Sequence, residues 1–317
     1  MLVEFRAKNF KSFKDEIAFS MVPAPKQKGL DYSILKNKIG SKEYKGLSSA
    51  VIYGPNAAGK TNIIGAMEVF KTIVLRGNIR NSERSTNVPN TAVNMLELIP
   101  NNSVKEKIPV EFSIKFIDNN LLIDYQLSLD IGGFLEDEYN RRVLSEILYV
   151  NENLVFSRKD TLQFDDLKVI KEYLVNDFED YELGVTTLAK SNLISEELFL
   201  MNGFKAMFSS KLVSIISNWF ETKFMVIYRA DSLYLSKKFL DSKKHIVFVE
   251  KTVNDAAEMF GINSNALAYV SPDEDSESKL CSVFKGDANN GAFITAEQFE
   301  SYGTIRFINM FPLVLNV

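Results

Sequence analysis

The sequence predicts an α/β fold in which a glycine-rich loop joins a buried strand to an amphipathic helix. Three observations lead to this prediction. The loop, at residues 54–61, stands between a short apolar run and a segment with helical spacing. Alternation of apolar and polar side chains, typical of strands, recurs through the first half of the 317 residues. Helical spacing dominates from about residue 165.

The N-terminal residues are predicted to form a β-hairpin. Side chains alternate between apolar and charged over residues 3–8, and between apolar and small over residues 17–21. A period of two is typical of strands with one buried face, and Asn9–Phe13 between them is predicted to be the turn. Residues 23–46 are rich in Pro, Lys, Gly and Ser, so we expect a loop there.

The middle of the chain is predicted to be rich in strands. Ser49–Tyr53 is a short apolar run without alternation, which is typical of a buried parallel strand. After the glycine loop, apolar residues recur every three or four positions from Ile63 to Val74, so we predict an amphipathic helix. Clean alternation predicts strands at 110–116 and 123–129, and residues 147–156 are predicted to form another hairpin.

The second half is predicted to be mainly helical. Apolar residues have helical spacing from about residue 165 to 222, and again from Ile246 to Phe260. Shorter elements complete the prediction: strands at 224–228, 281–284 and 292–294, and a helix from about Thr304.

Composition argues against several classes of function. The formal net charge of −4 is unlike the basic excess of a dedicated nucleic-acid binder. One cysteine, Cys281, allows neither an intramolecular disulfide nor a zinc cluster, and one histidine, His245, makes a His-based triad a poor expectation. No apolar run approaches the length of a membrane span, and the N-terminal residues lack a signal-peptide pattern. We therefore expect a cytoplasmic protein without membrane association.

The glycine-rich loop is the most specific motif. It matches the phosphate-binding pattern G-x-x-x-x-G-K-[ST] at every fixed position, as Gly54-Pro55-Asn56-Ala57-Ala58-Gly59-Lys60-Thr61. Glycines let the backbone curl so that N–H groups face phosphate oxygens, and the following helix adds the positive end of its dipole. Lys60 is predicted to reach the β- and γ-phosphates, and the Thr61 hydroxyl to ligate Mg²⁺. The alternative is a glycine turn that only joins strand to helix.

Residues around this loop carry a first family resemblance. Asn56 within the loop, Asn62 after it and the Asn9–Phe13 turn of the preceding hairpin resemble the ABC-type ATPases of the SMC and RecF group. The resemblance implies an ABC-like head with mixed and antiparallel sheets, in which the hairpin helps to frame ATP. It also adds Asn62 to the expected nucleotide-binding residues.

A second resemblance lies near the C-terminus. Within Glu300–Arg306, the residues Ser301, Gly303 and Thr304 are similar to the serine-glycine signature of ABC-type ATPases, in its S-x-G-T form. The resemblance implies that Ser301 and Gly303 contact the γ-phosphate of ATP bound to a second protomer, so that ATP favours a homodimer. The alternative is an ordinary helix N-cap.

Over nearly its whole length, the chain resembles a bacterial AAA-family ATPase group of the RloA-like or abortive-infection type. The resemblance implies a first lobe of the ATPase core at 1–160, a helical insertion or lid at 161–290, and a helix at 291–317 that returns to the core. Members are often encoded beside a nuclease or another toxic effector in phage defence. A homodimer that regulates such an effector is the function this implies.

One expected part of a hydrolysing head is missing from the sequence. In the resembled family, a Walker B strand with Asp and Glu, and then a switch His, follow the signature, but no such pattern occurs up to Val317. Ile246–Glu250 and Leu121–Asp124 fit its apolar positions, yet each supplies one acid and precedes the signature. We expect either a truncated chain or one that depends on a partner, with instability or oligomerisation as the consequence.

Two further functions stay open. A DNA-repair or chromosome-maintenance ATPase of the RecF or SMC kind would need a basic DNA-facing surface, for which Arg80 is a candidate, and long heptads. The acidic charge weighs against it. A non-hydrolysing regulatory subunit that only binds nucleotide is suggested by the missing Walker B strand.

Overall fold

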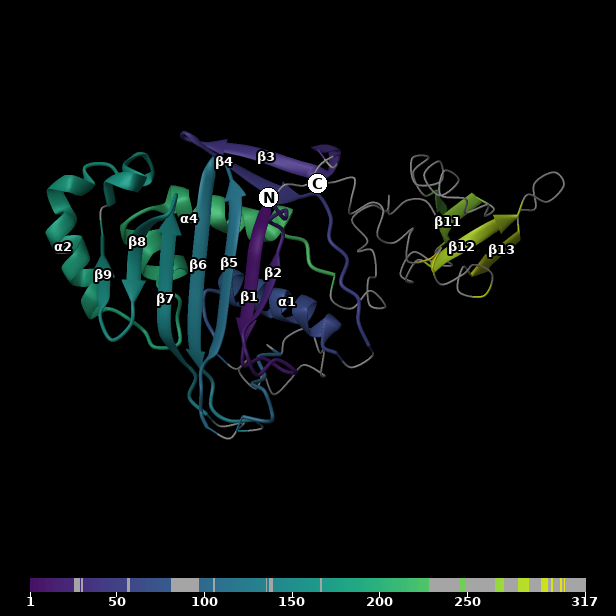
Figure 1. Ribbon diagram of the computed structural model, residues 1–317, viewed down its shortest axis with the longest axis horizontal. Coiled ribbons are helices and arrows are strands. Elements are labelled where there is room, and N and C mark those ends of the chain that lie inside the picture. The colour runs from purple at the N-terminus through teal and green to yellow at the C-terminus, as the bar shows by residue number, and fades with distance from the viewer. Residues whose placement is uncertain are drawn as a thin grey trace. The chain divides into compact units, whose positions relative to one another are not determined.

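The computed structural model forms two compact units, Met1–Tyr228 and Arg229–Val317 (Figure 1). These units do not coincide with the expected boundaries at residues 160 and 290. The structure describes residues 1–25, 29, 31–55, 58–80, 97–104, 106–134, 136, 139–165, 167–227, 246–248, 266–270, 279–284, 292–295, 298, 303 and 305.

A seven-stranded antiparallel sheet forms the frame of the first unit, with the strand order β2-β1-β5-β6-β7-β8-β9. It confirms the predicted N-terminal hairpin, the strands after residue 110 and the hairpin at 147–156. The turn of that last hairpin places Asn151 and Glu152 at φ 52° and 68°, as tight hairpins require. The strands are β1 (Leu2–Lys8), β2 (Ile17–Ser20), β5 (Val110–Asp118), β6 (Leu121–Asp130), β7 (Arg142–Val150), β8 (Asn153–Arg158) and β9 (Leu162–Phe164).

One face of this sheet packs against the helix that follows the glycine loop. Helix α1 spans Lys60–Arg76, as predicted. Its Phe70 is fully buried and lies 6.0 Å from Phe5, 5.8 Å from Phe112 and 6.1 Å from Tyr125 between ring centroids. These three partners come from β1, β5 and β6, so the period-two alternation of the strands places one apolar face under α1.

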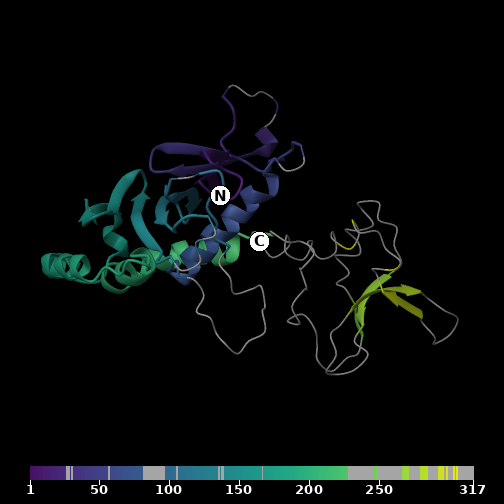
Figure 2. The ribbon, with the colours of Figure 1, turned by 90° about the horizontal axis from the view of Figure 1, so that it is seen from below.

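The helices predicted after residue 165 pack on the same core. Trp219 stacks on Phe116 of β5 at 3.8 Å, and Phe220 lies 5.9 Å from Phe70 of α1. Figure 2 shows these helices and α1 on one side of the sheet. They are η3 (Leu167–Tyr173), α2 (Phe178–Ser191), the π-helix η4 (Leu200–Phe204), α3 (Lys205–Met207), α4 (Ser210–Asn218) and the π-helix η5 (Trp219–Lys223).

The prediction of a loop over residues 23–46 is wrong from Asp31 onward. A short 3₁₀ helix, η1 (Asp31–Ser33), leads into an antiparallel hairpin of β3 (Ile34–Ile39) and β4 (Lys42–Leu47). Its sequence shows little apolar alternation, because most of its side chains are exposed or half-buried. The hairpin packs through Ile39 and Tyr44 on a small cluster around Val3, far away in the sequence.

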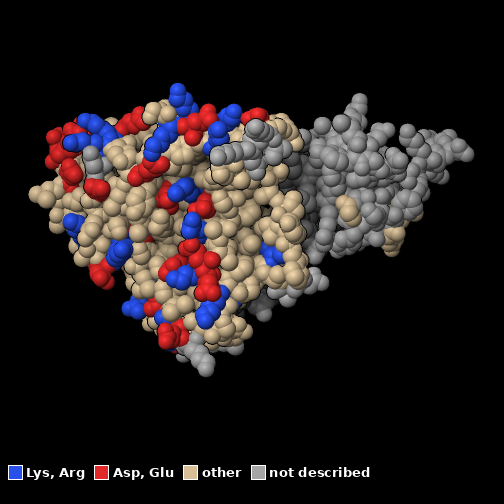
Figure 3. All heavy atoms as spheres, viewed as in Figure 1, with Lys and Arg blue, Asp and Glu red and all other residues tan. Residues whose placement is uncertain are grey.

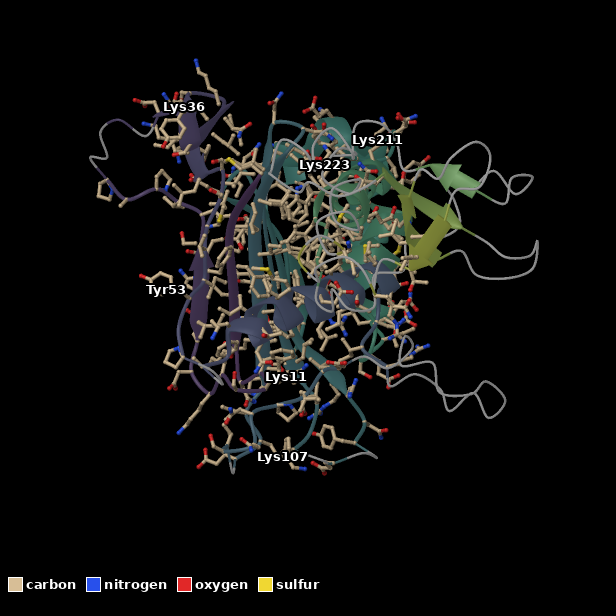
Figure 4. The ribbon with its side chains drawn as sticks, turned by 90° about the vertical axis from the view of Figure 1, so that its right-hand side faces the viewer. Lys11, Lys36, Tyr53, Lys107, Lys211 and Lys223 are labelled. Atoms are coloured by element: carbon tan, nitrogen blue, oxygen red, sulfur yellow. The ribbon has the colours of Figure 1, made fainter. Side chains whose placement is uncertain are left out.

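The predicted buried strand at Ser49–Tyr53 is also wrong. The segment has no strand structure, and the side chains of Val51 and Tyr53 are 84% and 90% exposed. Tyr53 points away from the sheet (Figure 4). Residues 224–227 likewise form no strand, and Tyr228 lies outside the described residues. An apolar run becomes a buried strand only where strands lie beside it, and the described part of this unit provides none there.

The second unit contains a four-stranded antiparallel sheet of β10 (Ile246–Phe248), β11 (Ala266–Val270), β12 (Lys279–Phe284) and β13 (Ala292–Thr295). The predictions near 281–284 and 292–294 are confirmed. The helical prediction from Ile246 is wrong at its start, because Ile-Val-Phe pairs with β11 and is a strongly strand-forming run. The stretch expected as a helical insertion, 161–290, therefore also contains strands.

The described residues contain no helix that is both long and apolar enough to cross a membrane. Gln298, Gly303 and Ile305 are helical, in the region where a helix was expected from about Thr304. Thr304 itself, His245 and most of the 246–260 segment lie outside the described residues.

Candidate phosphate-binding site

The start of α1 has the features of an anion site. Gly59 precedes the helix in the left-handed conformation, at φ 85° and ψ 8°, and no side chain caps the first turn. Its N–H groups are therefore not all satisfied within the helix, and the positive end of the helix dipole lies at the same place. A phosphate group is a suitable partner for such a helix start.

Lys60 lies inside the curl of the glycine loop. Its Nζ donates to the carbonyl oxygens of Gly54 and Pro55, each at 2.7 Å. The loop also closes through Ala58, whose N–H donates to the Pro55 carbonyl at 3.3 Å. A lysine ammonium has three donors. Two of them hold the loop, so one remains for a bound anion.

Thr61 is exposed on the first turn of α1, next to Lys60. Its hydroxyl can ligate Mg²⁺, which keeps several waters and takes further oxygen ligands from phosphates. In the part of the chain that the structure describes, no group of three acidic, His or Cys side chains could hold a metal alone. The residues present fit a magnesium ion that arrives with a nucleotide rather than a metal in its own cage.

The N-terminal hairpin touches the loop. Nδ2 of Asn62 donates to Oγ of Ser12 at 2.7 Å, across fifty residues of sequence. A Cβ at Gly59 would lie 2.6 Å from the same Ser12 Oγ and 2.9 Å from the ring of Phe13. The loop therefore rests directly on the Asn9–Phe13 turn. Sequence reasoning noted this turn and Asn62 separately, but no local signal revealed that they touch.

Replacing Gly59 with alanine should damage the site. The left-handed φ disfavours any L-side chain by about 1–2 kcal/mol, and the new methyl would collide with Ser12 and Phe13. We expect a lower melting temperature and weaker ATP binding. The loss in binding free energy should be at least as large as the loss in the free energy of unfolding. Gly184→Ala is the matched control, because a Cβ there meets nothing within 4 Å inside α2. It should stabilise the fold by about 1 kcal/mol, and equal behaviour of the two variants would contradict the prediction.

The other candidate residues are only partly placed. Asn56 and Ala57 of the loop, Ser301 and Thr304 of the signature-like segment, and Glu250 lie outside the described residues. Gly303 is helical and exposed. Asp124 pairs with Lys115 at 3.1 Å, and it points to the sheet face opposite α1, because its neighbour Tyr125 contacts Phe70. Asp124 is therefore not placed to act at the loop.

The sheet face opposite α1 carries mixed charge. Figure 3 shows Lys and Arg interspersed with Asp and Glu over this face. Arg6 pairs with both Glu4 and Glu16 at 2.7 Å. Arg80, considered above as a DNA-facing residue, is engaged by Glu196 at 3.3 Å and Glu197 at 2.7 Å. The described residues on this face do not form the one-signed patch that a DNA-binding surface requires.

Comparison with known proteins identifies the family. The family described as "AAA domain, putative AbiEii toxin, Type IV TA system" matches residues 49–316, which is most of the chain and includes the whole glycine loop. The hairpins β1–β2 and β3–β4 precede the matched region. The comparison with curated proteins finds no match. The match over residues 49–316 shows that the chain belongs to this family of AAA domains, and with it to the P-loop NTPases.

Proposed function

We propose that the chain binds ATP with Mg²⁺ at Gly54–Asn62 and works as an ATPase-type regulator of a partner effector, a nuclease or a toxin, in phage defence. The observation that carries the nucleotide site is Lys60. Its ammonium lies within the loop, held by two loop carbonyls at 2.7 Å, at the uncapped start of α1. Family membership supports the ATPase part, and the AbiEii-type description supports the link to defence.

The finer parts of the proposal rest on resemblance. We assign the chain to the RloA-like type with an ABC-like head, in the cytoplasm. Lys60 and Thr61 would hold ATP and Mg²⁺ on one protomer, while Ser301, Gly303 and Thr304 of a second protomer would close over the γ-phosphate. ATP would then favour the homodimer, because only the closed dimer makes both sets of contacts.

A non-hydrolysing regulator is the second candidate. It is favoured by the position of Asp124, which pairs with Lys115 on the sheet face away from α1. Asp124 is therefore not placed to orient an attacking water at Lys60. The third candidate, a DNA-repair ATPase of the RecF or SMC kind, is disfavoured by the net charge of −4 and by the pairing of Arg80.

The test is equilibrium binding of a fluorescent ATP analogue, with and without Mg²⁺, beside an assay of phosphate release. Magnesium-dependent binding with turnover supports an ATPase, and binding without turnover supports the non-hydrolysing regulator. Absence of binding in the wild-type chain would overturn both.

The dimer is tested by light scattering with and without ATP. Ser301→Arg should prevent ATP-dependent dimerisation and leave binding to the single chain intact. A Ser301→Arg variant that loses nucleotide affinity as a monomer would contradict the contact between protomers.

A further inference from the structure

The Asn9–Phe13 turn is a firmly held part of the fold. Phe10 is fully buried and lies 5.5 Å from Phe112 of β5. Across the turn, the N–H of Phe10 donates to the carbonyl of Phe13 at 2.9 Å, and the reverse bond is 2.8 Å. The turn therefore moves with the core of the sheet.

Two buried amides hold the same turn from the other side. Nδ2 of Asn9, which is 1% exposed, donates to the carbonyl of Ile108 at 2.8 Å. Oδ1 of Asn9 accepts from the N–H of Asn101 at 3.1 Å, and Nδ2 of Asn101 donates to the carbonyl of Lys11 at 2.7 Å. Both Asn9 and Lys11 have left-handed backbones, with φ of 51° and 46°. Such a conformation persists where its surroundings fix it.

One side chain of this turn reaches the loop–helix junction. Oγ of Ser12 accepts from Nδ2 of Asn62 at 2.7 Å. The same oxygen lies only 2.6 Å from the position that a Cβ of Gly59 would take. Asn62 follows Lys60 and Thr61 on the first turn of α1, and its N–H donates to the Gly59 carbonyl at 2.9 Å. The Ser12 hydroxyl thus contacts the residues on both sides of Lys60 and Thr61.

We propose that Ser12 is a positioning residue of the nucleotide site. Through Asn62, it fixes the first turn of α1 so that Lys60 and Thr61 are arranged for phosphate and Mg²⁺ before ATP arrives. This inference rests on the proposed function of the loop. Ordering of the turn before binding increases affinity, because the bound state then loses less conformational freedom.

The experiment is a double-mutant cycle on ATP binding. Ser12→Ala and Asn62→Ala each remove the same hydrogen bond, so each should weaken ATP binding by about threefold to tenfold. The double variant should bind ATP no more weakly than the single variant with the lower affinity, since the bond can be lost only once. Ser12→Thr keeps the hydroxyl, and because Ser12 is exposed, the added methyl has room. It should bind ATP like the wild type.

The control is Ser128→Ala on the half-exposed face of β6, away from α1. It should leave ATP affinity unchanged. Ser12→Ala should lower the melting temperature by no more than a few degrees, so that a general loss of structure does not account for weaker binding. Wild-type affinity in Ser12→Ala, or losses that multiply in the double variant, would overturn the proposal.

Hydrogen exchange separates this inference from the function on which it rests. In Ser12→Ala without nucleotide, the amides of residues 64–66, which donate to the carbonyls of the first turn of α1, should exchange about threefold to tenfold faster than in Ser128→Ala. Faster exchange in a chain that binds no ATP would refute the nucleotide site while showing that Ser12 holds the turn. Unchanged exchange would refute the positioning role, even if ATP binds.

Discussion

Lys60→Ala is expected to weaken ATP binding by about a hundredfold or more, because hydrogen bonds to charged groups contribute about 1.5–3 kcal/mol each. The substitution removes the ammonium that would reach the phosphates. It also removes both bonds to the carbonyls of Gly54 and Pro55 that hold the loop curled. Titration with a fluorescent ATP analogue in the presence of Mg²⁺ measures the loss directly.

Stability should change little in the same variant, since Lys60 lies outside the buried core. Lys211→Ala is the matched control, because Lys211 is an exposed lysine of α4 (Figure 4). This variant should bind ATP with the affinity of the wild type. Lys60→Arg should also bind ATP weakly, because a planar guanidinium does not fit the space of a compact ammonium between two carbonyls. Affinity within threefold of the wild type in Lys60→Ala would contradict the site itself.

Elements with a strong local pattern could be predicted from the sequence. Alternation over residues 110–129 predicted β5 and β6, and the stripe from Ile63 to Val74 predicted α1. Each of these segments buries one regular face, so the spacing of its apolar residues indicates whether it is a strand or a helix. The loop could be predicted for a similar reason, because Gly59, Lys60 and Thr61 are neighbours whose roles depend on the start of a single helix.

Features that depend on distant residues could not be predicted. The β3–β4 hairpin packs through Ile39 and Tyr44 on Val3, which no pattern within residues 23–46 indicates. Ser49–Tyr53 has the composition of a buried strand, but strand pairing depends on neighbours supplied elsewhere in the chain. The contact between Ser12 and Asn62 joins two segments that were each noticed alone.

A buried carboxylate escaped the sequence analysis for the same reason. Glu146 is fully buried in β7, where it replaces an apolar residue on the core-facing side. Its Oε1 accepts from the Tyr125 hydroxyl and the N–H of Leu200, both at 2.8 Å, and its Oε2 accepts from the N–H of Phe199 at 2.7 Å. Arg158, 4% exposed, lies 3.6 Å from Oε2. Only the tertiary structure brings these donors together.

This arrangement joins the helices to the sheet. Burial raises the pKa of Glu146, while the N–H groups of Leu200 and Phe199 and the charge of Arg158 act in the opposite direction. Arg158 also donates to the carbonyls of Glu197 at 2.5 Å and Ile194 at 2.7 Å. The segment before η4 is therefore fixed to β7 and β8 by one polar network inside an apolar core.

Glu146→Ala is expected to lower the free energy of unfolding of the first unit by about 3–5 kcal/mol, the usual cost of breaking a buried ion pair. The variant leaves the Arg158 charge buried without its carboxylate, and two backbone N–H groups without acceptors. Glu146→Gln should cost less, because an amide oxygen can still accept from one of them. Trp219, the single tryptophan of the chain, is 2% exposed in this unit, so its fluorescence reports urea unfolding of the first unit alone.

The control for Glu146→Ala is the same substitution in an exposed ion pair. Glu179 pairs with Lys171 at 2.7 Å, but both side chains are 67% exposed. Water already solvates these charges, so Glu179→Ala should change the unfolding free energy by less than about 1 kcal/mol. If the two alanine variants unfold at the same urea concentration, the buried network does not join the helices to the sheet. If only Glu146→Ala is destabilised, the attachment of the helices to the sheet depends on a single carboxylate in β7.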